Sequence, residues 1–118
     1  MECKVLTGLG GIFIDDQVIA TIAGNTCLEC YGIVAMCSKR ATDGIVEIFK
    51  GENLTRGVKV QLKESSAIVN LYIIVEYGIS IAAVANSVIE SVKYHIENQT
   101  GVTVEAVNVT VEGIRVEK

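Results

Sequence analysis

The chain has 118 residues, of which half are hydrophobic and 20% are charged, and it contains no proline and no tryptophan. This length supports one domain with a buried core, and the composition excludes disordered and collagen-like chains. The formal net charge of −4 and the scattered basic residues exclude the clustered basic surface that binds nucleic acid. We therefore expect a single domain over residues 1–118.

The N-terminal segment carries no apolar run of signal-peptide length, so we expect a cytosolic protein. The span 65–89 has Glu76 as its one charged residue and is therefore a candidate membrane helix. However, it contains Asn70 and Gly78, and its hydrophobic period changes halfway along, which a uniform spanning helix has no reason to do. We expect no direct membrane span.

The first predicted elements are a short strand at Gly10–Ile14 and a helix that continues to about Thr26, with Asp15 or Asp16 as its N-cap. The segment "GIVAMCSK" is typical of a strand that is apolar on both faces. For residues 41–57 we expect a loop with a short amphipathic turn of helix, which contains Ile45, Val46, Ile48 and Phe49.

A hairpin is predicted next, because "VKVQLK" alternates strictly and "ESS" makes a turn into a long apolar strand. The period of two assigns one wholly apolar face to the core: Ala67, Val69, Leu71, Ile73, Val75 and Tyr77. The opposite face is mixed and comprises Ile68, Asn70, Tyr72, Ile74 and Glu76. We expect the first face to lie in the core and the second to be partly covered by other residues.

A strand-to-helix joint follows at Gly78, which suits a turn with positive φ, and at Ser80, which is a good N-cap. The helix runs from Ile81 to about Asn98, and Gly101 ends it. In the last strand the apolar parity slips twice, and each slip predicts a bulge or a bend: Val102 and Val104, then Val107, Val109 and Val111, then Ile114 and Val116.

The predicted order is β-α-β-β-β-α-β. Two amphipathic helices and half-exposed strands are best buried as an α+β two-layer sandwich. We expect both helices on one face of a mixed, mostly antiparallel sheet.

Five blocks of the sequence resemble the alkaline shock, or envelope stress response, family, also written Asp-twenty-three/Gls-twenty-four, and in particular its short YloU-like members. They are "GGIFIDDQVIATIAG", "YGIVAM", "GVKVQL", "VNLYIIVEYGISI" and "TGVTVEAVNVTVEGI", and they cover nearly the whole chain in family order. The block around Glu76, Tyr77 and Gly78 is the most specific. The sequence lacks the charged terminal extensions of longer members, so functions that reside in such tails are not implied.

The resemblance implies a small cytoplasmic protein of Gram-positive bacteria with a role in cell-envelope homeostasis. Some members are held at the membrane by a separate anchoring partner. The YloU-like branch tends to sit beside a dihydroxyacetone-kinase-like protein associated with fatty-acid phosphorylation, which suggests a link to lipid metabolism. The family supplies no catalytic residues that transfer to this chain.

Cys27 and Cys30 have the CxxC spacing of redox and metal motifs. A redox pair normally sits at a helix N-terminus, whereas this one falls at a helix C-terminus beside Glu29, which favours buried or incidental cysteines over redox or metal binding. The only histidine, His95, lies in the last turns of its helix, and no sequence signal places a nucleophile beside it, which favours a structural role over a catalytic base.

These observations predict a non-enzymatic binding or scaffold protein with no cofactor and no metal site. The expected interaction residues are Tyr72, Ile74, Glu76 and Tyr77, and we expect a homo-oligomer that also binds other proteins. The alternative is a small ligand-binding or thiol-redox module that uses Cys27 and Cys30.

Overall fold

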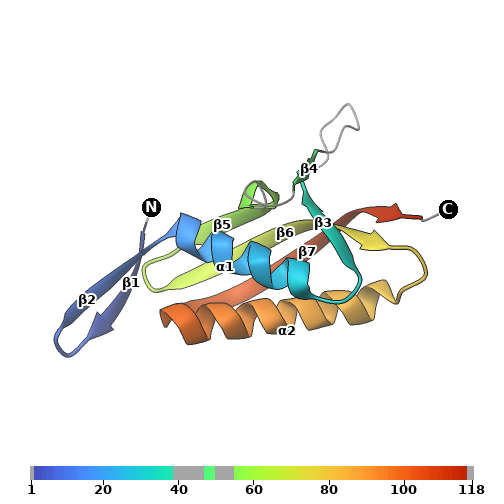
Figure 1. Cartoon of the computed structure of the whole chain (residues 1–118). Coiled ribbons are helices and arrows are strands. Elements are labelled where there is room, and N and C mark those ends of the chain that lie inside the picture. The colour runs from blue at the N-terminus through green and yellow to red at the C-terminus, as the bar shows by residue number, and fades with distance from the viewer. Residues whose placement is uncertain (1, 39–46, 50–54, 117–118) are drawn as a thin grey trace.

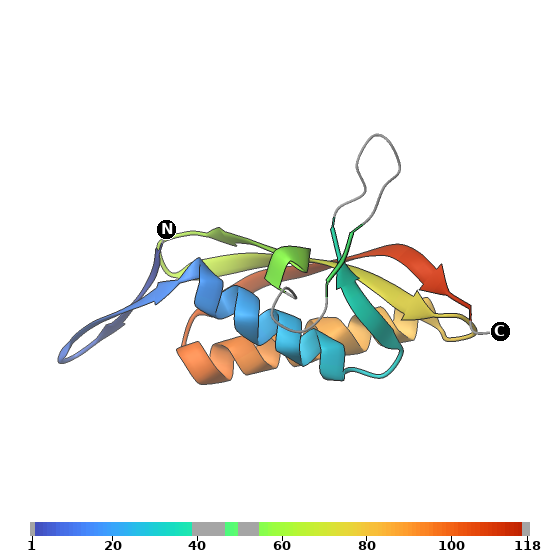
Figure 2. The same ribbon diagram turned by 45° about the horizontal axis from the view of Figure 1, so that its top comes forward.

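The computed structural model describes residues 2–38, 47–49 and 55–116. It contains a five-stranded sheet with both helices on one face, which confirms the predicted two-layer α+β sandwich (Figures 1 and 2). The predicted order is confirmed, and two further strands, β1 and β4, are added to it. In chain order the elements are β1 (Glu2–Thr7), β2 (Gly10–Asp15), α1 (Asp16–Glu29), β3 (Ile33–Cys37), β4 (Ile48–Phe49), β5 (Val58–Leu62), β6 (Ser66–Glu76), α2 (Ile81–Thr100) and β7 (Thr103–Arg115).

Strand β6 is the centre of the sheet. It pairs in parallel with β7 over its full length, from Ser66↔Thr103 to Glu76↔Arg115. Its other edge is shared by two antiparallel partners, with β5 along the first half and β3 along the second. The parallel pair requires a crossover, and α2 provides it. Strand β7 is therefore an edge strand, since no other strand in the described part of the chain pairs with it.

The helix ends follow the predicted capping residues. The Gln17 amide donates a hydrogen bond to Asp15 Oδ1 at 3.3 Å at the start of α1, and the Ala83 amide donates to Ser80 Oγ at 3.4 Å at the start of α2. Gly101 ends α2 in the left-handed region with φ of 78°. Each cap satisfies a backbone group that the helix itself leaves without a partner.

The core lies between the sheet and the two helices. The predicted inward face of β6 is buried from Ala67 to Val75, and α2 contributes one stripe at helical spacing: Val84, Val88, Val92 and Ile96. The prediction is wrong at Tyr77, which is 70% exposed. The reason is that β6 ends at Glu76, so the alternation of faces stops one residue before Tyr77.

The two predicted irregularities of β7 are confirmed as register shifts against β6. Ala67 pairs with Val104 and Ile68 with Ala106, so Glu105 is an extra residue. Glu112 is the second extra residue, between the partners of Ile73 and Ile74. The first bulge returns Val107, Val109 and Val111 to the helix-facing side of the sheet, and the second returns Ile114 to the side of its partner Val75.

Strand β1 was not predicted, although Cys3 and Val5 alternate with charged neighbours. It pairs with β2 in an antiparallel hairpin that turns at Gly8 and Leu9, and we call residues 2–15 the arm. The arm projects from one end of the sandwich (Figure 1). At its base Cys3 is buried and the Lys4 amide donates a hydrogen bond to the Glu64 carbonyl oxygen at 3.0 Å.

The predicted helical turn in residues 41–57 is wrong at Ile48 and Phe49. These residues form the short strand β4, which pairs with Cys37 and Met36 of β3. The other two predicted positions, Ile45 and Val46, lie outside the described residues.

Candidate binding site at the ends of β3, β6 and β7

Three strands meet where β6 ends. The Glu76 amide donates a hydrogen bond to the Gly32 carbonyl oxygen at 3.0 Å, just before β3 begins. The Tyr77 amide donates to the Arg115 carbonyl oxygen at 2.9 Å, at the end of β7. Backbone hydrogen bonds on both sides therefore fix the position of Glu76 and Tyr77, which places these side chains on a rigid support.

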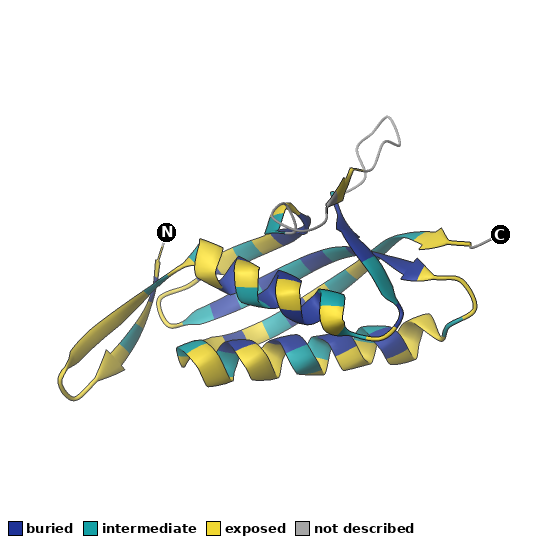
Figure 3. Ribbon diagram, viewed as in Figure 1, coloured by how far each residue is buried: buried dark blue, intermediate teal, exposed yellow. Residues whose placement is uncertain are grey.

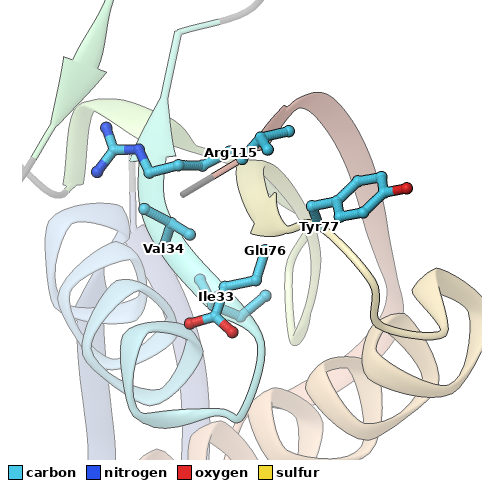
Figure 4. Close-up of a pocket in the computed structure, with 6 residues that line it drawn as sticks. Ile33, Val34, Glu76, Tyr77 and Arg115 are labelled. Atoms are coloured by element: carbon cyan, nitrogen blue, oxygen red, sulfur yellow. The ribbon is translucent and has the colours of Figure 1, made fainter. Parts of the chain in front are cut away.

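A pocket of about 450 Å³ opens at this point and is lined by Ile33, Val34, Glu76, Tyr77, Arg115 and Val116. Figure 4 shows the Glu76 and Arg115 side chains extending toward β3, while the Tyr77 ring points the opposite way. The pocket thus presents a carboxylate and a guanidinium beside an apolar wall of β3. Such a mixture suits a ligand with both charged and apolar groups, as a protein surface has.

A second depression of about 390 Å³ lies on the other side of the joint and is lined by Tyr31, Gly78, Ile79, Ser80, Ala83, Val84 and Ser87. Tyr31, from the turn between α1 and β3, is 79% exposed. We call Tyr31, Glu76, Tyr77 and Arg115 the corner surface. Its four side chains come from three separate parts of the chain.

Two glycines give the corner its shape. Gly78 has φ of 91°, which confirms the predicted positive-φ joint, and Gly32 has φ of 86°. A Cβ at Gly32 would lie 2.8 Å from Ile79 Cδ1 and 3.1 Å from Val84 Cγ2. The chain before β3 therefore approaches the start of α2 so closely that a side chain at residue 32 would require the Ile79 and Val84 side chains to move.

The four predicted interaction residues separate into two groups. Glu76 and Tyr77 lie in the corner surface, whereas Tyr72 and Ile74 lie on the sheet face opposite the helices. Ile74 is only 9% exposed, and its register partners are Ala35 and Gly113. Tyr72 is half-buried.

Two members of the corner surface, Tyr31 and Arg115, were missed by the sequence reasoning. Arg115 is the parallel register partner of Glu76, so knowledge of the β6–β7 register identifies it. The sequence gives a weaker indication of Tyr31, which is its position directly before Gly32, the glycine that makes the close approach.

Comparison with known proteins identifies the family to which this chain belongs. Residues 4–116 match a family described as having a cell envelope-related function. The chain belongs to the Asp-twenty-three family. It is 42% identical to YloU of Bacillus subtilis over 117 residues, 98% of each chain. It is 37% identical to Spy1614 of Streptococcus pyogenes, over 98% of this chain and 97% of that protein.

Among solved structures, the CTD of MamM is similar to this Asp-twenty-three member, with a TM-score of 0.51 over 84% of this chain and 99% of that one. The sequence identity is 9%, so this likeness concerns the fold alone. The predicted resemblance to the envelope stress family and the predicted fold class are both confirmed.

Three of the four cysteines of this Asp-twenty-three chain are poorly suited to thiol chemistry. Burial raises the pKa of Cys27 to about 12, and the neighbouring Cys30 adds to the effect. Burial also raises the pKa of Cys30 and of Cys3. The Cys30 thiol lies 3.3 Å from the Thr26 carbonyl oxygen, at the C-terminal end of α1. Since the thiolate is the reactive form, these thiols are held in their unreactive form at neutral pH.

Other groups that carry chemistry are dispersed in this family member. In residues 2–38, 47–49 and 55–116, no group of three or more His, Cys, Asp and Glu side chains is arranged to hold a metal ion. His95 is exposed on α2, with Nδ1 2.8 Å from the Ser91 carbonyl oxygen and its ring edge-on to Tyr94. Neither α1 nor α2, the described helices, is long and apolar enough to cross a membrane.

Proposed function

We propose that this Asp-twenty-three protein is a non-enzymatic scaffold that docks a protein partner on its corner surface and also associates with itself. The observation that carries the proposal is the exposure of Tyr31 and Tyr77 at the same end of the fold as Arg115, where two depressions open. Tyrosine and arginine are enriched among the residues that dominate protein–protein binding energy. Their rigid backbone support reduces the entropy that is lost when a partner binds.

The family's cell envelope-related function directs the choice of partner. We propose two candidates, a membrane-anchoring protein and a dihydroxyacetone-kinase-like protein. The first would hold this chain at the inner side of the membrane without a span of its own, and the second would connect it to lipid metabolism. A scaffold role fits the composition of the corner, where Glu76, Arg115 and two tyrosines provide recognition and no nucleophile lies beside a base.

The test is affinity capture from the native cell followed by a binding titration with each captured protein after purification. We expect Tyr77→Ala and Arg115→Ala each to weaken binding by about 30-fold, since a residue that dominates an interface contributes about 2 kcal/mol or more. His95→Ala is the matched control, because His95 is also exposed but lies far along α2 from the corner. Unchanged affinity in both corner variants, with the variants folded, would refute docking at this surface.

A further inference from the structure

The arm carries a group of apolar side chains that the described fold leaves uncovered. Leu6 is 73% exposed, Leu9 at the tip is fully exposed, and Phe13 is 60% exposed. Ile12 is 47% exposed but lies on the opposite face of the arm, where it pairs with Val5. Figure 3 shows the arm as an almost continuous exposed ribbon at one end of the molecule. Apolar patches of this kind on a soluble protein mark interaction sites.

The arm is built so that these side chains stay outside. Thr7 Oγ1 accepts hydrogen bonds from the amides of Leu9 and Gly10 at 3.2 Å, which closes the turn. The Phe13 ring lies against Gly11, with its Cζ 3.3 Å from the place where a Cβ would be, and next to Leu6 on the same face. The six-pair ladder between β1 and β2 keeps the tip from folding back onto the core.

We propose that the arm is the self-association element of this protein, and that its apolar outer face packs against the arm of a second copy about a two-fold axis. This inference rests on the self-association part of the proposed function and assigns a surface to it. A two-fold contact uses the same patch on both copies, so one exposed face is sufficient to build it.

The area available on one face of the arm suits a weak contact with a second copy. Leu6 and Phe13 lie on the same face and Leu9 lies at the tip, and with side-chain areas on the order of 150–200 Å² these three residues present about 400 Å² of apolar surface. Two arms that cover one another therefore remove about 800 Å² from water through these side chains. With the flanking backbone, the contact falls in the range below about 1,200 Å² that weak, reversible complexes bury.

Charge favours a protein over a lipid surface as the occupant. Residues 5–14 carry no charge, whereas the base of the arm carries Glu2, Asp15 and Asp16 against the single base Lys4. The Lys4 ammonium already lies 5.9 Å from the centre of the Phe13 ring. An anionic membrane would therefore repel the base of the arm, while an uncharged outer arm from a second copy would not.

The outer edge of β7, the longest strand, is less suited to this role. The outer edge of β7 is long and has no proline, but bulges at Glu105 and Glu112 interrupt it. Glu105 forms an ion pair with Lys63 at 2.8 Å. Bulges and charged residues on an edge strand are the devices by which sheets avoid pairing with other chains. The arm has no such protection in its outer half.

The experiment is sedimentation velocity on the full chain from 1 to about 200 µM, a range that covers typical weak dimers. We expect the wild type to form a dimer, and Leu9→Glu with Phe13→Glu to raise the dimer dissociation constant by about a hundred-fold, because two charges per copy are placed in the contact. Tyr94→Glu is the control, since it replaces an exposed aromatic of α2 by a glutamate away from the arm. Concentration-dependent amide chemical shifts in the wild type should be confined to residues 4–14.

Each alternative result has a distinct meaning. A dimer that persists in the double variant overturns the arm as the contact, while leaving self-association through another surface. A wild type that stays monomeric throughout overturns both the arm inference and the proposed self-association, and partner docking at the corner keeps its own test. A monomer whose arm binds anionic vesicles, with binding lost in the double variant, overturns the second copy as the occupant.

Discussion

The joint that holds the corner surface depends on one backbone conformation, that of Gly78. Its φ of 91° lies in a region that residues with a side chain rarely adopt, yet a Cβ placed there would meet no heavy atom within 4 Å. The replacement Gly78→Ala therefore introduces backbone strain and no steric contact. We expect it to lower the free energy of unfolding by about 1–2 kcal/mol, and Gly78→Val by about 1–3 kcal/mol because the branched side chain is stiffer.

Replacements at two other glycines distinguish the effect of backbone strain from that of steric contact. Gly8→Ala also places its Cβ in open space, but at an ordinary φ, so we expect stability to be unchanged or raised by about 0.4–1 kcal/mol. Gly32→Ala combines a φ of 86° with contacts of 2.8 and 3.1 Å, so its loss should exceed that of Gly78→Ala.

Urea denaturation followed by circular dichroism measures these differences. With a slope of about 1.5 kcal/mol per molar urea, Gly78→Ala should move the midpoint down by about 1 M. A Gly78→Ala protein as stable as the wild type would contradict the strain argument. Equal losses for Gly78→Ala and Gly32→Ala would contradict the steric part.

Two further predictions concern the thiols and the start of α2. Burial holds the Cys27 pKa at about 12 against an ordinary 9.0, so the unfolded chain releases this proton first and stability falls as pH rises. Between pH 9 and 12 we expect the free energy of unfolding, measured by urea denaturation, to fall by up to about 1.4 kcal/mol per pH unit more than it would without Cys27. Cys27→Ala should lack this additional fall, and the same dependence on pH in that variant would contradict the assignment to Cys27. Ser80→Ala should cost about 0.5–2 kcal/mol through the lost N-cap, whereas Ser87→Ala, within the exposed part of α2, should cost nothing; equal losses in thermal melts would argue against the cap.

The parts of the fold that were predictable are those governed by local pattern. The stripe of α2, the caps at Asp15 and Ser80 and the alternation in β6 each depend on residues a few positions apart. The two bulges of β7 were readable for the same reason, because the parity of the valines must slip wherever an extra residue is inserted. Tyr77 shows the limit of this reasoning, since alternation alone does not say where a strand stops.

The features that escaped prediction depend on which strands become neighbours. Strands β5 and β3 pair in succession along one edge of β6. This arrangement follows from tertiary packing, so no single segment of the sequence indicates it. The corner surface combines Tyr31, Tyr77 and Arg115 from three such segments, and so only one of its tyrosines was identified. The alternation of β1 is short and leads into a glycine-rich turn, which obscured the arm.

The bulges in β7 also determine which changes in its length the chain tolerates during evolution. Substitution at Glu105 or Glu112 leaves the register of the other residues untouched. Deletion of either residue moves every later residue of β7 to the opposite face, and deletion of Glu105 would turn Val107, Val109 and Val111 away from the helices. Deletion of both restores the faces beyond the second site but inverts the segment between them. Homologues should therefore vary freely in residue type at these two positions while keeping the number of residues between Val104 and Ile114 constant.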